Sequence, residues 1–106
     1  MLKRAKRRYI ALGIDANATP SSKELMDAIW TTITKLYGEY GASLTNLTLI
    51  DYNPEKRVAV IRTSRAAVNI VRTALTLITT IADNEVAVHV LTVSGTIKAL
   101  YKKLKQ

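Results

Sequence analysis

The residues able to perform acid–base or metal chemistry in this chain are few and widely spaced. His89 is the only histidine, and there is no cysteine to join it as a second metal ligand. Acidic residues come close together only as Glu24 with Asp27 and as Asp83 with Glu85. Glu24 fits the start of a helix and the second pair brackets a turn, so neither pair is typical of a general acid and base. We therefore expect no catalytic residue, no metal site and no cofactor in this chain, and we expect His89 to be a half-buried sheet residue.

Basic side chains are the more informative chemical groups, because they gather at the two ends of the sequence. The formal net charge is +8, yet the segment from Tyr9 to Ile97 has seven basic residues against all eight acids. The excess consists of Lys3, Arg4, Lys6, Arg7, Arg8, Lys98, Lys102, Lys103 and Lys105. Clustered cations bind a polyanion with release of its condensed counterions, so this pattern favours a nucleic-acid partner. A solubilising tail at each terminus is the alternative.

The length and composition are those of one cytoplasmic domain. A chain of 106 residues is near the usual size of a single domain, so residues 1–106 are expected to share one core. The absence of cysteine means that nothing requires an oxidising compartment. Apolar stretches are shorter than the roughly 20 residues needed to cross a bilayer, and no secretory signal is evident.

The spacing of apolar residues predicts the elements that must position the basic groups. Alternation indicates strands and a spacing of three or four indicates helices, while Ser21 with Glu24 fits a capping box. The expected elements are a strand over 7–14, a helix over 22–37, strands over 44–50 and 58–63, a helix over 65–82, a strand over 86–94 and a helix over 96–105. This order predicts an α+β fold, ferredoxin-like or similar to the RNA-recognition motif, with a four-stranded antiparallel sheet and an added carboxy-terminal helix. Residues 1–7 form a basic arm and residues 96–106 a basic helix.

The segment 65–82 has an unusually wide apolar face. One stripe consists of Val68, Val71, Leu75 and Ile78, and the adjoining one of Ala67, Ile70, Ala74, Leu77 and Ile81. Either this helix packs on both the sheet and the first helix, or part of its face binds a partner.

The expected strand order brings the basic groups together. In the order 4-1-3-2 the start of strand one and the ends of strands three and four meet at one edge. The cations expected there are Arg7, Arg8, Arg62, Arg65 and Lys98, with Arg72 extending the patch along the second helix and Lys102 along the last. The segment Ser94-Gly95-Thr96 can present backbone amides to a phosphate at the start of that helix.

Aromatic residues give little support to base stacking on the sheet. An RNA-recognition motif stacks bases on aromatic side chains of its central strands, whereas this chain has no phenylalanine and only Tyr9 on strand one is available. Recognition by phosphate contact and shape is the better expectation. Trp30 and Tyr37 are expected to be core or helix-packing residues.

Four segments in register resemble the ribonuclease P protein component 2 family of archaea. They are Lys6-Arg7-Arg8-Tyr9-Ile10, Tyr37-Gly38-Glu39-Tyr40-Gly41-Ala42, Val60-Ile61-Arg62-Thr63-Ser64-Arg65 and Val93-Ser94-Gly95-Thr96-Ile97-Lys98. The resemblance spans nearly the whole chain and implies RNA contact by Arg8, Arg62, Arg65, Gly95, Thr96 and Lys98. Thr63 stands where relatives often have cysteine.

The resemblance also implies a role and partners. The role is that of a non-catalytic subunit in a ribonucleoprotein that removes the 5′ leader of precursor tRNA, with cleavage performed by the RNA subunit using Mg²⁺. The implied partners are ribonuclease P RNA, the TIM-barrel-like protein component 3 and, indirectly, precursor tRNA, while self-association as a homodimer is left open.

Two other functions fit parts of the sequence. A ribosomal or other structural RNA-binding protein would have the same fold and charge, and the RNA that co-purifies would distinguish it. A regulatory ligand-binding domain would use the apolar face of 65–82 as an oligomer contact, but it leaves the charge at both termini unexplained.

Overall fold

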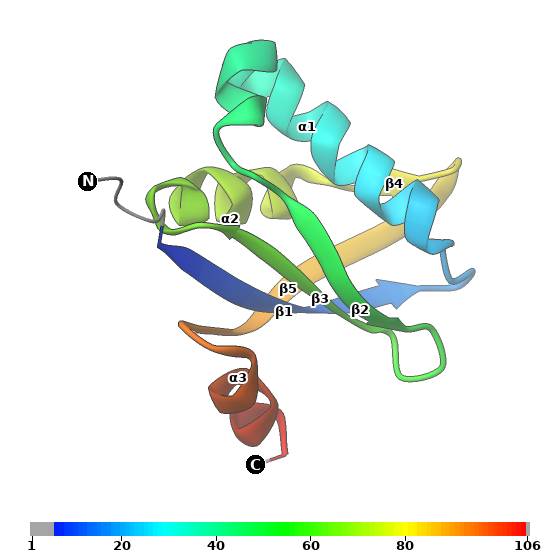
Figure 1. The fold of residues 1–106 in the computed structure, drawn as a ribbon. Helices are drawn as coiled ribbons and strands as arrows, with labels where there is room; N and C mark the ends of the chain where they lie inside the picture. The colour runs from blue at the N-terminus through cyan, green and yellow to red at the C-terminus, as the bar shows by residue number, and fades with distance from the viewer. Residues whose placement is uncertain (1–5, 106) are drawn as a thin grey trace.

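The structure is a computed structural model that describes residues 6–105, so residues 1–5 of the expected basic arm and Gln106 lie outside the described residues. Two helices lie on one face of an antiparallel sheet and a third lies on the other (Figure 1). The elements are β1 (Arg7–Ala16), α1 (Ser22–Ser43), β2 (Thr48–Asn53), β3 (Val58–Ser64), a 3-10 turn (Arg65–Ala67), α2 (Val68–Leu77), β4 (Thr80–Ile81), β5 (Asn84–Ser94) and α3 (Ile97–Leu104).

The sheet has the predicted order with one addition. Its strands lie in the order β2-β3-β1-β5-β4, so β1 is central and pairs antiparallel with both β3 and β5. The ferredoxin-like arrangement is therefore confirmed. The predicted count of four strands is wrong, because the two-residue β4 forms a hairpin with the start of β5.

The prediction of one continuous helix over 65–82 was wrong at both ends. The segment begins as a 3-10 turn and α2 ends at Leu77, after which Thr79 and Thr80 favour extended backbone. Ala82 and Asp83 have φ values of 52° and 66°, as in a two-residue hairpin turn. Ile81 is nonetheless buried, which explains why its spacing resembled a helical stripe.

Helix α1 begins as predicted and continues past its predicted end. The Ser21 hydroxyl accepts from the Glu24 amide at 3.1 Å, and the Glu24 carboxylate accepts from the Ser21 amide at 2.9 Å, which confirms the capping box. Gly38 breaks the helix with a φ of 77°, a conformation that glycine adopts without strain. The chain then resumes helical turns as far as Ser43, so β2 starts at Thr48 rather than at 44.

The main core lies between the sheet and the pair α1 and α2. It includes Ile10, Leu12, Leu25, Ile29, Ile33, Ile61, Val71 and Leu75, all fully buried. The apolar face of α2 packs against both the sheet and α1. This arrangement is the first of the two interpretations of that face, in which the helix packs on both the sheet and the first helix.

Helix α3 covers part of the opposite face of the sheet. Leu100 is fully buried against Ala11 and Val60. The Tyr101 hydroxyl donates to the Asp51 carboxylate at 3.0 Å, and Lys103 Nζ donates to the Val93 carbonyl at 3.1 Å. Burial, and then the hydrogen bond to Asp51 and its charge, raise the pKa of Tyr101, so this phenol keeps the proton that it donates.

We expect Leu100→Ala to lower the free energy of unfolding by about 2–4 kcal/mol, because it removes the central apolar contact of α3 and leaves a cavity. Urea unfolding followed by circular dichroism measures the change. Leu91→Ala is the control, since Leu91 is 49% exposed; it should alter stability by no more than about 0.5 kcal/mol. Equal effects of the two substitutions would show that α3 is not packed as described.

Candidate nucleic-acid interface

The register of the central strands gathers basic residues that are far apart in sequence. Arg7 pairs with Ser64, and Tyr9 pairs with both Arg62 on β3 and Ser94 on β5. The Arg65 amide donates to the Lys6 carbonyl at 2.8 Å, so the contact between these two segments continues one residue beyond the pair of Arg7 and Ser64. We call the resulting surface the basic edge and define it as Arg7, Arg8, Arg62, Arg65 and Lys98.

Arg8 lies against Gly95, directly after the end of β5. A Cβ atom at Gly95 would be 3.5 Å from Arg8 Nη1 and 3.8 Å from its Cζ. The same nitrogen donates to the Arg7 carbonyl at 2.9 Å, and this contact holds the guanidinium over the β5–α3 connection. Arg8 and the segment leading into α3 therefore form one continuous part of the surface.

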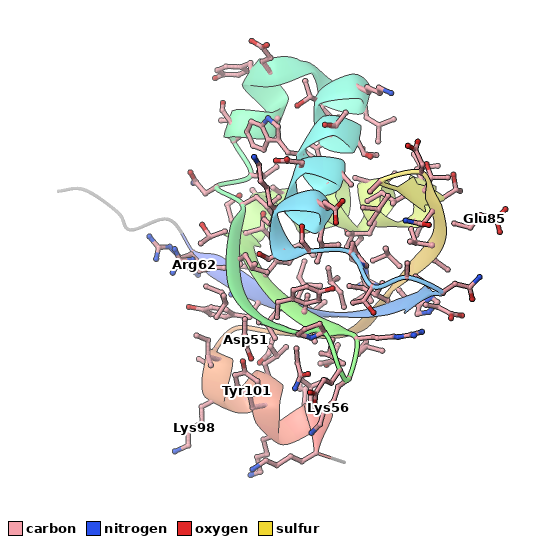
Figure 2. All side chains as sticks on the ribbon, turned by 90° about the vertical axis from the view of Figure 1, so that its right-hand side faces the viewer. Asp51, Lys56, Arg62, Glu85, Lys98 and Tyr101 are labelled. Carbon is pink, nitrogen blue, oxygen red and sulfur yellow. The ribbon has the colours of Figure 1, made fainter. Side chains whose placement is uncertain are left out.

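The basic edge presents charge to both faces of the sheet. Neighbouring residues of a strand point to opposite faces, so Arg7 and Arg8 diverge. Arg62 pairs with Tyr9 and shares the face that carries α3. In Figure 2, Arg62 and Lys98 lie on the same side of the molecule, with Asp51 and Tyr101 between them.

The start of α3 extends this surface. The Thr96 hydroxyl caps the helix by accepting from the Ala99 amide at 3.2 Å, and its own proton is left to donate to a phosphate oxygen. Lys98 and Lys102 are both exposed and stand one turn apart. Lys102 thus continues the row of cations along α3.

Arg72 is the one predicted contact that the fold does not bring to the basic edge. It lines a hollow with Thr76 of α2 and with Val86, Val88 and Val90 of β5. Those β5 residues lie in the first half and middle of the strand, whereas the basic edge is at its end. The 3-10 turn before α2 also breaks the helical spacing by which Arg72 was placed on the face of Arg65.

The end of β3 is fixed by polar groups that sequence reasoning missed. The Thr63 hydroxyl and the Ser64 amide both donate to the Thr45 carbonyl, at 2.7 and 2.8 Å. Ser64 Oγ also donates to the Leu44 carbonyl at 3.0 Å. Because these bonds hold the residues between Arg62 and Arg65, both guanidinium groups extend from a fixed backbone.

Most acidic residues lie at the opposite end of the sheet. They follow or precede the strand ends that are farthest from the basic edge, and Glu85 lies across the molecule from Arg62 in Figure 2. Six of the eight acids are there: Asp15, Glu24, Asp27, Glu55, Asp83 and Glu85. The charge is therefore uneven along the sheet, with the excess of cations at the basic edge.

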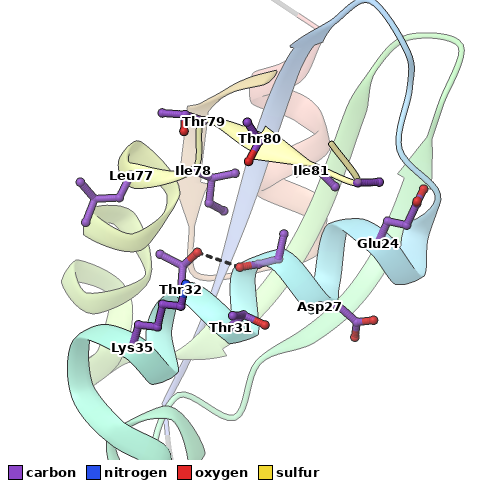
Figure 3. A pocket seen from close by; sticks show the side chains of 12 residues that line it. Glu24, Asp27, Thr31, Thr32, Lys35, Leu77, Ile78, Thr79, Thr80 and Ile81 are labelled. Atoms are coloured by element: carbon purple, nitrogen blue, oxygen red, sulfur yellow. Dashed lines mark hydrogen bonds between the residues drawn. The ribbon is translucent and has the colours of Figure 1, made fainter. Parts of the chain in front are cut away.

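The hollow between α1 and the α2–β4 segment offers no catalytic arrangement. Its volume is about 480 Å³, and its lining includes Glu24, Asp27, Thr31, Thr32 and Lys35 (Figure 3). The Thr32 hydroxyl donates to the carbonyl of Ala28 at 2.8 Å, and no histidine lines the hollow. Nothing here pairs a nucleophile with a base.

Metal-binding groups are not clustered in the part of the chain that the structure describes. Within residues 6–105, no three residues of the types His, Cys, Asp and Glu are grouped to hold a metal ion. His89 is exposed, so the prediction that it is half-buried was wrong: it pairs with Gly13 on the sheet face that α3 covers only in part.

Hydropathy gives one further result. Across residues 6–105, no helix combines the length and the apolar composition needed to span a membrane.

Comparisons with known proteins agree with the fold and with the sequence pattern. Ribonuclease P protein component 2 of Pyrococcus abyssi is 35% identical over 100 residues, which cover 94% of this chain and 85% of the relative. The Methanococcus aeolicus protein of the same name is 36% identical over 94% of this chain and 73% of the relative. A chain in the cryo-EM structure of yeast ribonuclease MRP has the same fold, with a TM-score of 0.72 and 11% identity over 100% of this chain and 96% of that one.

The family comparison covers the whole set of elements just described. The model of the Rpp14/Pop5 family matches residues 8–105, from the start of β1 through α3. This match includes every residue of the basic edge except Arg7. The chain therefore belongs to the Rpp14/Pop5 family.

Proposed function

We propose that this protein is an RNA-binding, non-catalytic subunit of ribonuclease P that supports removal of the 5′ leader from precursor tRNA. The observation that carries the proposal is the basic edge, where Arg7, Arg8, Arg62, Arg65 and Lys98 meet at one end of a sheet whose other end holds most of the acids. The names of the archaeal relatives, ribonuclease P protein component 2, support the assignment to that enzyme.

The mode of RNA binding follows from the position of α3. Leu100 and Tyr101 occupy the part of the sheet face next to Ala11 and Val60, where a single-stranded RNA would otherwise stack its bases. The cations around that face are guanidinium and ammonium groups, which bind phosphate oxygens without reading sequence. A folded RNA, recognised by its backbone and shape, is the ligand that this surface fits best.

In this proposal the chemistry belongs to the RNA subunit. Ribonuclease P RNA holds the Mg²⁺ ions and cleaves precursor tRNA, while this chain neutralises phosphates and stabilises the folded RNA. The protein thus contacts precursor tRNA only indirectly and acts in the cytoplasm.

The proposed protein partner is component 3, and its docking surface differs from the one that the sequence suggested. The apolar face of α2 is buried within the fold. Instead, α1 exposes aromatic side chains from its middle to its last turns: Trp30 is 42%, Tyr37 41% and Tyr40 79% exposed. Exposed Trp and Tyr are typical of the residues that dominate protein interfaces. A second copy of this chain is the other occupant that this surface would accept.

Replacing Arg62 and Arg65 by alanine should weaken binding to ribonuclease P RNA and reduce the slope of log affinity against log salt by about one to two units. The reason is that each cation releases a counterion when it neutralises a phosphate. Filter binding over a range of KCl concentrations measures both quantities. The control is Lys23→Ala with Lys35→Ala, which removes the same formal charge from α1, away from the basic edge.

The comparison separates a placed site from net charge alone. The control pair should change the slope much less, with both double variants shown to be folded by circular dichroism. Equal losses of affinity and slope would mean that the basic edge is not a site. Tighter binding to ribosomal RNA than to ribonuclease P RNA would favour the structural RNA-binding alternative.

The purified protein, free of RNA, should not cleave precursor tRNA, because the described residues offer neither a metal cluster nor a nucleophile with a base. A cleavage assay with end-labelled precursor tRNA and Mg²⁺ checks this. Adding ribonuclease P RNA with the remaining subunits should restore the cut at the 5′ leader. Sustained Mg²⁺-dependent cleavage by the RNA-free protein would contradict the proposed division of labour.

The double variant Trp30→Ala and Tyr40→Ala should weaken binding to component 3 of the same organism by at least about 30-fold, since buried aromatic anchors each contribute about 2 kcal/mol to interfaces. Isothermal titration calorimetry measures this affinity. Leu77→Ala with Leu91→Ala is a matched control, because those side chains are also about half exposed but lie elsewhere. If the control weakens binding as much, the α1 surface is not the docking site.

A further inference from the structure

Strand β5 has an outer edge that is largely unpaired. Of its eleven residues, only Asn84 and Glu85 pair with β4, while the inner edge pairs with β1 along nearly its whole length. Lys103 Nζ reaches the Val93 carbonyl near the other end. Within residues 6–105, no hydrogen bond outside the β1 ladder reaches residues 87–92. This stretch presents free backbone groups on the side away from β1.

The alternation of an antiparallel ladder identifies the outward groups. The Val86 amide donates outward to the Thr79 carbonyl at 3.0 Å. Backbone groups of every second residue point to the same side, so those of Val88 and Val90 also point outward, up to the bulge at Leu91. Two donors and two acceptors are thus available at the spacing of a strand.

A hollow lies beside this edge, next to α2. Its volume is about 500 Å³, and it is lined by consecutive residues from Val86 to Val90 together with Arg72, Thr76, Ile78 and Thr79. Consecutive strand residues point to opposite faces, so a hollow that touches all of them lies at the rim of the strand rather than on one face. The space between α2 and β5 therefore has the arrangement of a groove that accepts an extended peptide.

The groove lacks the features that normally protect a sheet edge. Proteins guard edge strands with lysine, proline or covering elements. The sequence of β5 contains no Lys, Arg or Pro, and its only acid is Glu85, at the end that β4 covers. Arg72 is the permanently charged side chain in the lining.

We propose that the groove between α2 and the outer edge of β5 binds an extended segment of another protein as an added antiparallel strand, with an acidic residue of that segment opposite Arg72. The backbone groups of Val88 and Val90 supply affinity and Arg72 supplies selectivity. A single permanent cation beside apolar side chains does not suit RNA, which needs several phosphate contacts. Two copies joined through this edge would bring two Arg72 side chains near each other, so the charge favours an acidic partner over a second copy.

The test uses the full chain labelled with ¹⁵N and a synthetic peptide of about eight residues, the length of a typical strand, in which valine and threonine alternate around one central glutamate. Binding should shift amide signals in residues 86–92 and in α2, with a Kd below about 1 mM. Hydrogen exchange of the Val88 and Val90 amides should slow when the peptide is bound. A peptide of the same sequence, N-methylated at alternate residues on the side facing β5, should not bind.

Charge-reversal variants test the contact with Arg72. Arg72→Glu should weaken binding of the glutamate peptide about tenfold. The same variant should bind more tightly to a peptide with lysine at the central position. Lys35→Glu is the matched control, because Lys35 is exposed on α1 outside the groove, and it should leave peptide affinity unchanged. Circular dichroism of both variants excludes unfolding as the cause.

Three results would overturn the proposal. The first is a failure of peptide binding, seen as no amide shifts in residues 86–92 at saturating peptide or as equal affinity for the N-methylated and the unmodified peptide. The second is slow exchange at Val88 and Val90 in a free protein that sediments as a dimer, which would assign the edge to a second copy. The third is a loss of ribonuclease P RNA affinity in Arg72→Glu that exceeds the loss in Lys35→Glu, which would assign Arg72 to RNA. The peptide shifts and the amide exchange need neither RNA nor the basic edge, so these two readouts test the groove separately from the proposed function.

Discussion

The antiparallel pairing of β1 with both β3 and β5 is the constraint on which the rest of the structure depends. Because β1 is central, its first residues lie next to the last residues of both neighbours, as the pairs of Tyr9 with Arg62 and with Ser94 show. A shift of one residue in either register would turn the buried residues of that strand to the opposite face. The buried side chains of Ile10 and Leu12 therefore fix the register, and the register in turn fixes the positions of the cations.

Helix α3 determines how the sheet can be used. An open four-stranded sheet would offer its face to unstacked bases, but here Leu100 is buried on that face and Tyr101 is bound to Asp51. The cations that border this helix include Arg62 on one side of α3 and Lys98 on its first turn. The same helix that covers part of this face also adds cations to its border, an arrangement typical of binding to phosphates rather than to base edges.

The three surfaces lie on different elements of the molecule. The basic edge lies at one end of the sheet, and the exposed aromatic residues Trp30 and Tyr40 lie along α1. The free edge of β5 lies beside α2. Each surface has a distinct chemistry: cationic, aromatic, and backbone hydrogen bonding.

The sequence by itself determined the order of elements, because hydrophobic periodicity and local signals such as the Ser21–Glu24 capping box depend only on neighbours in the chain. That order, with the strand arrangement it implies, was enough to bring Arg8, Arg62 and Lys98 to one edge. Tertiary packing alone decided the rest. Buried Ile81 belongs to a hairpin rather than a helix, and Trp30 is exposed although its spacing fits a core. Arg72 lies beside the edge of β5, because the 3-10 turn before α2 breaks the helical spacing between Arg65 and Arg72. The spacing of apolar residues cannot predict such a change. It indicates which residues are buried, but not which neighbours they are buried against.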